Sequence, residues 1–137
     1  MGSKNHSLLQ ARLAYLLANL DKFNIFTELS IEINKTEYKP DVCLYPKFEN
    51  DYTKDNIKMT ELPLLAIEIL SPSQVAQELI DKIEIYFNAG IKSNWFVMPM
   101  PKSITVFSSI KNFETFSKGN LIDNIIGIEL AINEIFK

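Results

Sequence analysis

The sequence predicts an α/β fold in which a mixed β-sheet is flanked by α-helices. A nearly continuous apolar run at residues 63–70 (PLLAIEIL) is typical of a central strand that is covered on both faces. Segments with apolar residues at helical spacing, residues 6–20 and 73–89, lie before and after this run. Shorter segments that alternate apolar and polar residues predict further strands. The expected element order is α-β-β-β-α-β-β, which favours helices packed on a mixed sheet.

The first half of the chain is expected to hold one helix and a β-hairpin. Residues 24–33 alternate as a half-buried strand, and residues 38–45 predict the returning strand after a turn at residues 34–36. Residues 47–61 are polar, show no period and are expected to form a mobile loop. The helix at residues 6–20 is indicated by its apolar positions, which are Leu8, Leu9, Ala11, Leu13, Leu16, Leu17 and Leu20.

A second helix is expected directly after the central strand. Ser71-Pro72-Ser73 ends the apolar run, and Ser73 is predicted to cap the amino end of a helix that continues to Ala89. Gly90 is predicted to stop this helix. The remaining expected elements are strands at residues 91–98 and 103–108 with a turn at 99–102 between them, an edge strand at 113–116 and a closing helix at 130–136.

Length and composition predict one globular domain over residues 1–137, long enough to bury a core. Hydrophobic residues make up 47% of the chain and charged residues 23%, close to the average for soluble proteins. No apolar run approaches the roughly 20 residues that span a bilayer, and the start, MGSKNHS, lacks an apolar signal segment. Cys43 is the only cysteine, which fits a reducing compartment. We therefore expect a cytoplasmic protein without a membrane partner.

The net charge of −3 argues against a constitutive, high-affinity nucleic-acid binder. Such proteins usually carry a basic excess or a basic patch, whereas here the lysines are spread thinly and Arg12 is the only arginine. An acidic protein can still act on DNA if a metal ion neutralises the carboxylates of its site. Its binding to DNA would then be weak and sensitive to salt.

Glu68 is the residue that most strongly indicates a functional site. It stands between Ile67 and Ile69 in an otherwise apolar strand. An ionised carboxylate in such a place is costly unless a partner offsets its charge. A buried salt bridge, or a position at the wet end of the strand, would explain it. The sharper interpretation is a metal ligand.

Asp41 is the expected partner of Glu68. It follows Pro40 in the segment KPDVCLY, where Val42 and Leu44 would face the core, and aspartate is depleted in strands. Asp41 could also be a turn residue where the strand begins. Two carboxylates on neighbouring strands would form a hard-oxygen site suited to Mg²⁺ or Mn²⁺, the expected cofactor. Such an ion polarises a phosphodiester and lowers the pKa of the attacking water.

Lys82 is the third candidate for the site. On a helical projection it lies at the edge of the apolar stripe of residues 73–89, near Glu78 and Tyr86. One interpretation is a snorkelling lysine that pairs with Glu78, four residues earlier. The other is an ammonium group directed at the site, where it would orient the nucleophilic water or neutralise the developing charge.

Weaker signals come from several other residues. Glu28, at the first strand, is a candidate third acid near the metal. His6 is a lone histidine near the start and is expected to be exposed. Cys43 has no His or Cys cluster around it, which argues against zinc or thiol catalysis. Tyr86 and Trp95 are expected in the core, not stacked on bases. No Gly-rich phosphate loop or dinucleotide fingerprint is present.

The segments YKPDVCLY, LLAIEILSPS and KIEIYFNAGIKSNWFV together resemble the Uma-two family of the PD-(D/E)XK restriction-endonuclease-like superfamily. That family has Pro-Asp on one strand, a glutamate in an apolar strand ending in Ser-Pro-Ser, and a helix with Lys-x-x-x-Tyr-x-x-x-Gly before a strand with tryptophan. The matching residues here are Pro40, Asp41, Glu68, Lys82, Tyr86, Gly90 and Trp95.

The resemblance implies a restriction-endonuclease-like fold and a metal-dependent DNA endonuclease. Asp41 and Glu68 would be both metal ligands and catalytic residues, and Lys82 would be catalytic. DNA would be the partner. Endonucleases that cut both strands often dimerise, so a homodimer is one expected state.

Three positions depart from the pattern of the superfamily or of the family. Leu70 stands where the superfamily has its strand lysine, so the resemblance moves that role to the helix and to Lys82. Glu78 replaces an aspartate four residues before the lysine, and Met98 replaces an aspartate near the end of the tryptophan strand. Glu78 is kept as a further site candidate, with Glu28 and Tyr86. The alternative function is a catalytically silent domain that acts as an interaction or accessory module.

Overall fold

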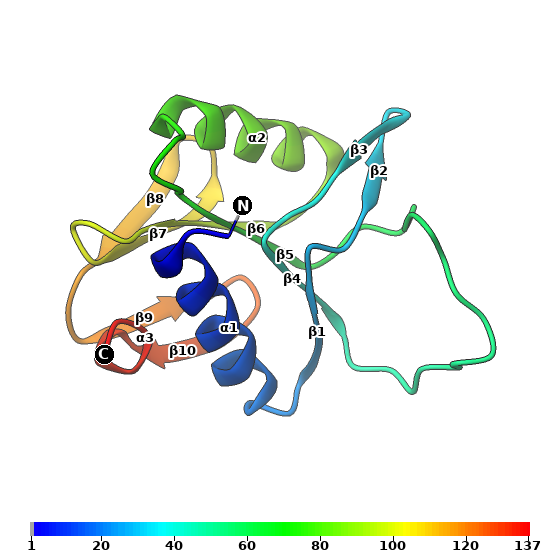
Figure 1. Ribbon diagram of the computed structural model, residues 1–137, viewed down its shortest axis with the longest axis horizontal. Coiled ribbons are helices and arrows are strands. Elements are labelled where there is room, and N and C mark those ends of the chain that lie inside the picture. The colour runs from blue at the N-terminus through cyan, green and yellow to red at the C-terminus, as the bar shows by residue number, and fades with distance from the viewer. Residues whose placement is uncertain (1) are drawn as a thin grey trace.

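A six-stranded mixed sheet forms the centre of the structure, a computed structural model that describes residues 2–137 (Figure 1). The strand order is β1–β4–β5–β6–β7–β8. The pair β5–β6 is parallel, and the other neighbouring pairs in this sheet are antiparallel. The six strands are β1 (Phe23–Thr27), β4 (Val42–Pro46), β5 (Leu65–Ile69), β6 (Ser93–Met98), β7 (Ser103–Ser109) and β8 (Asn112–Phe116).

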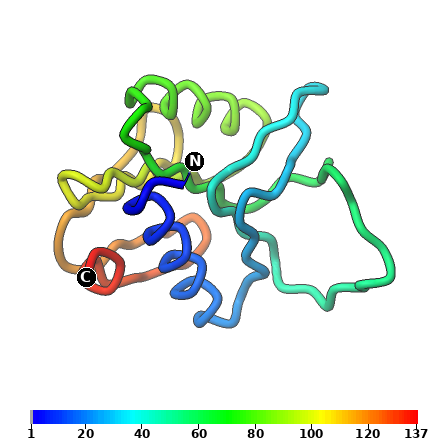
Figure 2. The backbone as a smooth tube through the Cα atoms, viewed as in Figure 1, coloured from blue at the N-terminus to red at the C-terminus, as the bar shows by residue number. Residues whose placement is uncertain are grey.

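Helices cover both faces of this sheet. Helix α2 (Ala76–Ala89) packs on one face, where Leu79 and Ile83 meet Phe96. Helix α1 (Lys4–Ala18) lies on the other face, and Leu9, Leu13 and Leu17 point into the main core there. The hairpin of β9 (Asn120–Asp123) and β10 (Ile128–Ala131), followed by α3 (Ile132–Ile135), lies on the α1 side (Figure 1). Figure 2 traces the same path as a tube.

The α/β class with a mixed sheet is confirmed. Strand β5 is buried along its whole length, as its apolar run predicts for a central strand. Helix α2 ends where expected, because Gly90 has a left-handed φ of 112° that favours glycine. The helix expected at residues 6–20 and the edge strand at residues 113–116 are present as α1 and β8.

The two strands of the expected hairpin are each broken in two. Residues 24–33 divide into β1 and β2 (Ile31–Ile33), and residues 38–45 divide between β3 (Thr36–Tyr38) and β4. The first break falls at Glu28, which has a positive φ of 52° and donates its N–H to the Asp41 carbonyl at 3.3 Å. The small β2–β3 hairpin therefore leaves the main sheet, and Asp41 lies just before β4.

Two further expectations were wrong in detail. Ser73 does not cap α2: Val75 is the N-cap, and no side chain caps the helix. The Gln74 side chain instead accepts hydrogen bonds from the N–H and hydroxyl of Ser71, which closes the preceding turn. Near the end of the chain, the sequence analysis missed the β9–β10 hairpin. The expected helix at residues 130–136 is shorter because its first two residues belong to β10.

Candidate functional site

A cavity of about 260 Å³ lies where α1, the start of β4, the end of β5 and α2 meet. Three of the residues that the sequence singles out, Asp41, Glu68 and Lys82, all line it, and so does Glu28. Their elements come from distant parts of the chain, so the fold brings these side chains together. The remaining lining residues are His6, Lys39, Ser71, Ser73 and Gln74.

Glu68 is a buried carboxylate with few donors. Only 3% of the residue is exposed. The Tyr86 hydroxyl donates to Oε2 at 2.7 Å, and Lys82 Nζ lies 3.9 Å from Oε1. Burial, followed by the negative charge of Asp41, raises the pKa of Glu68 from 4.5 to about 7, although Lys82 and Tyr86 act in the opposite direction. Glu68 is thus poised between its neutral and charged forms near neutral pH.

Asp41 is held by groups from three directions. Its Oδ2 accepts a hydrogen bond from the backbone N–H of Ile69 at 2.7 Å, which ties Asp41 to the residue that follows Glu68. His6 Nε2 lies 3.0 Å from Oδ1. The backbone carbonyl of Asp41 accepts a hydrogen bond from the Gln10 side chain at 2.8 Å. Asp41 therefore has a fixed orientation at the wall of the cavity.

Lys82 faces Glu68, not Glu78. Its side chain is 38% exposed, so the ammonium reaches the mouth of the cavity while remaining near Glu68. Glu78 is exposed, does not line the cavity and forms no ion pair with Lys82 within residues 2–137. Of the two interpretations of Lys82, the pairing with Glu78 is therefore wrong. Glu78, which was a further site candidate, also lies outside the cavity.

The other two candidates lie at the edge of this arrangement. Glu28 is exposed, and its carboxylate accepts a hydrogen bond from Gln10 at 3.2 Å. Tyr86 is fully buried and contributes its hydroxyl to Glu68. Burial and the charge of Glu68 raise the pKa of Tyr86, so it stays a neutral hydrogen-bond donor. Cys43 is also buried, and burial raises the pKa of its thiol to about 12, which excludes a reactive thiolate.

Gln10 is a site residue that the sequence analysis missed, and His6 is one that it ranked low. His6 was expected to be exposed, but only 4% of it is. A signal was available in the helix pattern. His6 lies on the same face of α1 as the buried Leu9, Leu13 and Leu17, so it occupies a position that faces the sheet.

The oxygen donors of the cavity fit a small divalent ion better than a softer metal. Mg²⁺ is commonly held by one or two carboxylates and keeps several waters, and Asp41 and Glu68 supply that donor set. Within residues 2–137, no group of three or more His, Cys, Asp or Glu side chains could hold a metal ion. The cavity therefore offers Asp41 and Glu68 as a pair of carboxylates, not a closed set of protein ligands. Asp41 and Glu68 would hold the ion, with open coordination positions left for water or substrate.

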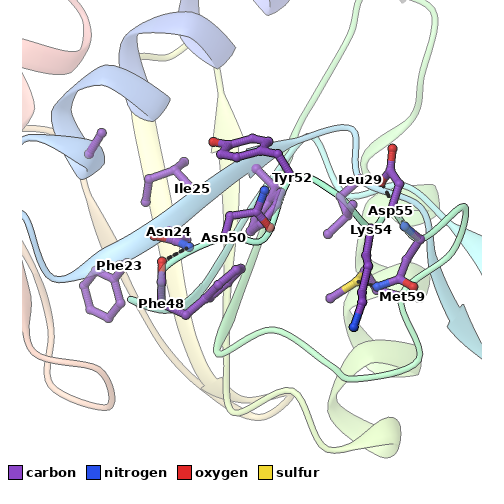
Figure 3. A pocket seen from close by; sticks show the side chains of 13 residues that line it. Phe23, Asn24, Ile25, Leu29, Phe48, Asn50, Tyr52, Lys54, Asp55 and Met59 are labelled. Carbon is purple, nitrogen blue, oxygen red and sulfur yellow. Dashed lines mark hydrogen bonds between the residues drawn. The ribbon is translucent and has the colours of Figure 1, made fainter.

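A larger cavity of about 660 Å³ lies elsewhere, between β1 and the segment of residues 48–59 (Figure 3). Phe48 and Tyr52 line it, and the Asn24 side chain donates to the Phe48 carbonyl at 3.0 Å. Asp55 is the one carboxylate among its lining residues. Size alone therefore does not locate the chemistry, because the pair of acids lies in the smaller cavity.

Comparisons with known proteins agree with the fold. The model of the Uma2 family, described as "Putative restriction endonuclease", matches residues 1–133. A crystal structure of "a putative nuclease belonging to DUF820" from Anabaena variabilis ATCC 29413 superposes with a TM-score of 0.83 at 18% sequence identity. The match covers 99% of this chain and 82% of that chain. No curated protein matches.

The fold and this site therefore define a restriction-endonuclease-like α/β protein. The family match over residues 1–133 is specific enough to go one step further, and the chain belongs to the Uma2 family. No helix within residues 2–137 is long and apolar enough to cross a membrane.

Proposed function

We propose that this protein is a nuclease that hydrolyses phosphodiester bonds in DNA with the help of Mg²⁺ or Mn²⁺. The observation that carries the proposal is the convergence of Asp41, Glu68 and Lys82 in one cavity. Two carboxylates that approach one another repel, and burial adds to the penalty, so their convergence calls for a cation. Membership of a family described as restriction endonucleases supports DNA as the substrate.

The roles of the acidic residues follow from their surroundings. Asp41 and Glu68 would hold the ion, which, when bound, polarises the phosphoryl oxygens and makes a bound water easier to deprotonate. The Tyr86 hydroxyl holds Oε2 of Glu68 in place. The Ile69 N–H does the same for Oδ2 of Asp41. These hydrogen bonds fix the side chains before substrate arrives.

Lys82 is proposed to act on the reaction, not on the metal. Its ammonium is a donor without lone pairs, so it cannot be a ligand. At the mouth of the cavity it can orient the attacking water or stabilise the negative charge that develops on the phosphorus oxygens. The Lys82–Glu68 distance of 3.9 Å leaves the ammonium free to donate to a third group.

The acidic net charge favours the alternative, a catalytically silent domain that serves as an interaction or accessory module. Glu78 and Met98 depart from the family pattern, which also supports this alternative. If the nuclease is active, its net charge of −3 implies weak DNA binding that falls steeply with salt. A homodimer would allow both strands of a duplex to be cut.

The test is cleavage of supercoiled and single-stranded DNA with Mn²⁺ at low salt. The parent protein should cut, and Asp41→Asn and Glu68→Gln should not, because each substitution replaces a charged ligand by a neutral one. Lys92→Ala is the matched control, since Lys92 is an exposed lysine outside the cavity. If the parent cuts neither substrate, the nuclease proposal fails and the silent domain becomes the better explanation.

A further inference from the structure

Helix α1 approaches Asp41 through two residues that are one turn apart. His6 Nε2 lies 3.0 Å from the Asp41 carboxylate, and Gln10 Nε2 donates to the Asp41 backbone carbonyl at 2.8 Å. Residues four apart share a face of an α-helix, so both side chains leave α1 toward the same target. Gln10 also donates to Glu28 at 3.2 Å, which joins the strained turn after β1 to the same helix.

His6 has no packing reason to be a histidine. It begins the buried stripe that continues with Leu9, Leu13 and Leu17, where an aliphatic side chain would fill the same space. Its Nδ1 is buried and has no hydrogen-bond partner within residues 2–137. Buried polar atoms are normally satisfied, so an unpaired ring nitrogen is a penalty that leucine would avoid. The benefit that offsets this penalty must come from the other nitrogen, which faces Asp41.

His6 Nε2 and Asp41 Oδ1 lie 3.0 Å apart, within the range of a charge-assisted hydrogen bond, and an imidazole N–H is the donor that an ionised carboxylate accepts. The Ser3 hydroxyl accepts from the His6 backbone N–H at 3.3 Å and starts α1 at this point, which places His6 in the first turn. The ring therefore reaches Asp41 from a fixed part of the helix.

We propose that His6 is a positioning residue for Asp41. In this arrangement, His6 holds Oδ1, the Ile69 N–H holds Oδ2, and Gln10 holds the backbone. The carboxylate then keeps one orientation toward Glu68. We call these three contacts to Asp41 the clamp. Its consequence for metal binding rests on the proposed function, but the clamp is present in the metal-free chain and can be measured there.

Hydrogen exchange at the Ile69 amide, followed by NMR on the metal-free protein, tests the clamp. His6→Leu fills the space but removes the donor, so Asp41 should loosen its hold on the Ile69 N–H. Exchange at Ile69 should then rise about tenfold more than at other amides of β5. His6→Gln, which can present an amide nitrogen near the position of Nε2, should restore slow exchange. Leu9→Ala removes packing from the same helix without touching Asp41, and its effect should be spread evenly over the sheet.

Direct binding of Mn²⁺, measured by calorimetry, is the second measurement. Loss of a group that orients a ligand typically weakens metal affinity 10–100-fold. We expect a loss of about tenfold in His6→Leu, recovery in His6→Gln and none in Leu9→Ala. The positioning role is overturned if exchange at Ile69 in His6→Leu rises no more than at its neighbours. If the clamp behaves as expected but the parent binds no Mn²⁺, the proposed function fails and the clamp stands.

Discussion

Glu68 and Asp123 are both buried carboxylates beside β6, and their surroundings differ in a way that separates structure from function. Asp123 is 1% exposed and accepts hydrogen bonds from the Ser93 hydroxyl, the Trp95 indole at 2.8 Å and the backbone N–H groups of Ile125 and Ile126. These donors come from β6 and from the turn between β9 and β10. Asp123 thus fastens the hairpin to the sheet.

Glu68 has a single hydrogen-bond donor, Tyr86, within residues 2–137, and it faces a second carboxylate. A buried carboxylate whose hydrogen bonds are all made rigidifies the fold around it. A buried carboxylate with few donors is destabilising, and the binding of a cation can offset that cost. Burial of an acid alone therefore does not identify a site. The number and kind of its donors do.

The largest expected effect concerns the cavity that Glu68 and Lys82 line. Lys82→Ala should lower the rate of DNA cleavage by about 10²–10³-fold, the usual loss when one group that stabilises the transition state is removed. Metal affinity and melting temperature should change little, since Lys82 is neither a ligand nor a core residue. The rate is measured with Mn²⁺ in excess.

Lys82→Arg separates charge from shape. A planar guanidinium cannot replace a compact ammonium beside a water, so cleavage should stay low. Cleavage at the parent rate in Lys82→Ala would remove the lysine from the reaction.

The second effect concerns the other carboxylate. Asp123→Ala should lower the free energy of unfolding by at least about 3 kcal/mol, because it leaves the Trp95 indole and neighbouring donors buried without an acceptor. Urea denaturation measures it. Any change in the cleavage rate per folded molecule should be small. A stable Asp123→Ala variant would show that the hairpin is held by packing alone.

The third effect is a pH dependence of stability. The folded-state pKa of Glu68 is about 7 and the ordinary value is 4.5. A raised pKa means that the neutral form is favoured on folding, so the contribution is present below pH 4.5 and is lost as pH rises to about 7. Its size is at most about 3 kcal/mol.

Glu68→Gln removes this dependence. Unfolding of parent and variant in urea, both stripped of metal, should show equal stability near pH 4.5 and a more stable variant at pH 8. If the stabilities of parent and variant change in parallel across this range, the folded-state pKa of Glu68 is not raised.

The smallest expected effect is the response to metal. Mn²⁺ at about a hundred times its dissociation constant should stabilise the parent by about 2.7 kcal/mol, visible as a higher melting temperature. Because the ion binds the ionised carboxylate, its affinity should increase as pH rises toward 7. Asp41→Asn and Glu68→Gln should lose the response. An unchanged response in both variants would exclude these residues as ligands.

Much of the fold and of the site is encoded in local patterns. The apolar run around Glu68 predicts a central strand, and the helical spacing of residues 73–89 brings Lys82 to the edge of the buried face. Asp41 and Glu68 follow from the rule that strands avoid unpaired charge. The structure places all three together.

What the sequence does not reveal depends on contacts between distant residues. Glu28 adopts a positive φ although it is not glycine, and the Asp41 carbonyl that receives its N–H lies in a later segment. The hairpin of β9 and β10 was not predicted, because contacts with distant residues help to hold it in place. Asp123 accepts hydrogen bonds from Trp95 and Ser93, which lie on β6. His6 belongs to the site because it contacts Asp41, and helix periodicity predicts which face a residue lies on but not which residue it contacts.

The hydrogen bond between the Ile69 N–H and Asp41 has an evolutionary consequence. The paired residues of β4 and β5 end at Val42 and Ile67, and beyond that point the Asp41 side chain takes the place of a strand in binding the backbone. A lineage that abandons catalysis still gains stability from this aspartate. Lys82 makes no hydrogen bond to the backbone within residues 2–137, and its one ion pair there is with Glu68, itself a proposed metal ligand. In descendants that drift toward a silent role, the lysine should therefore disappear first, and the aspartate should persist as a relic of the lost chemistry.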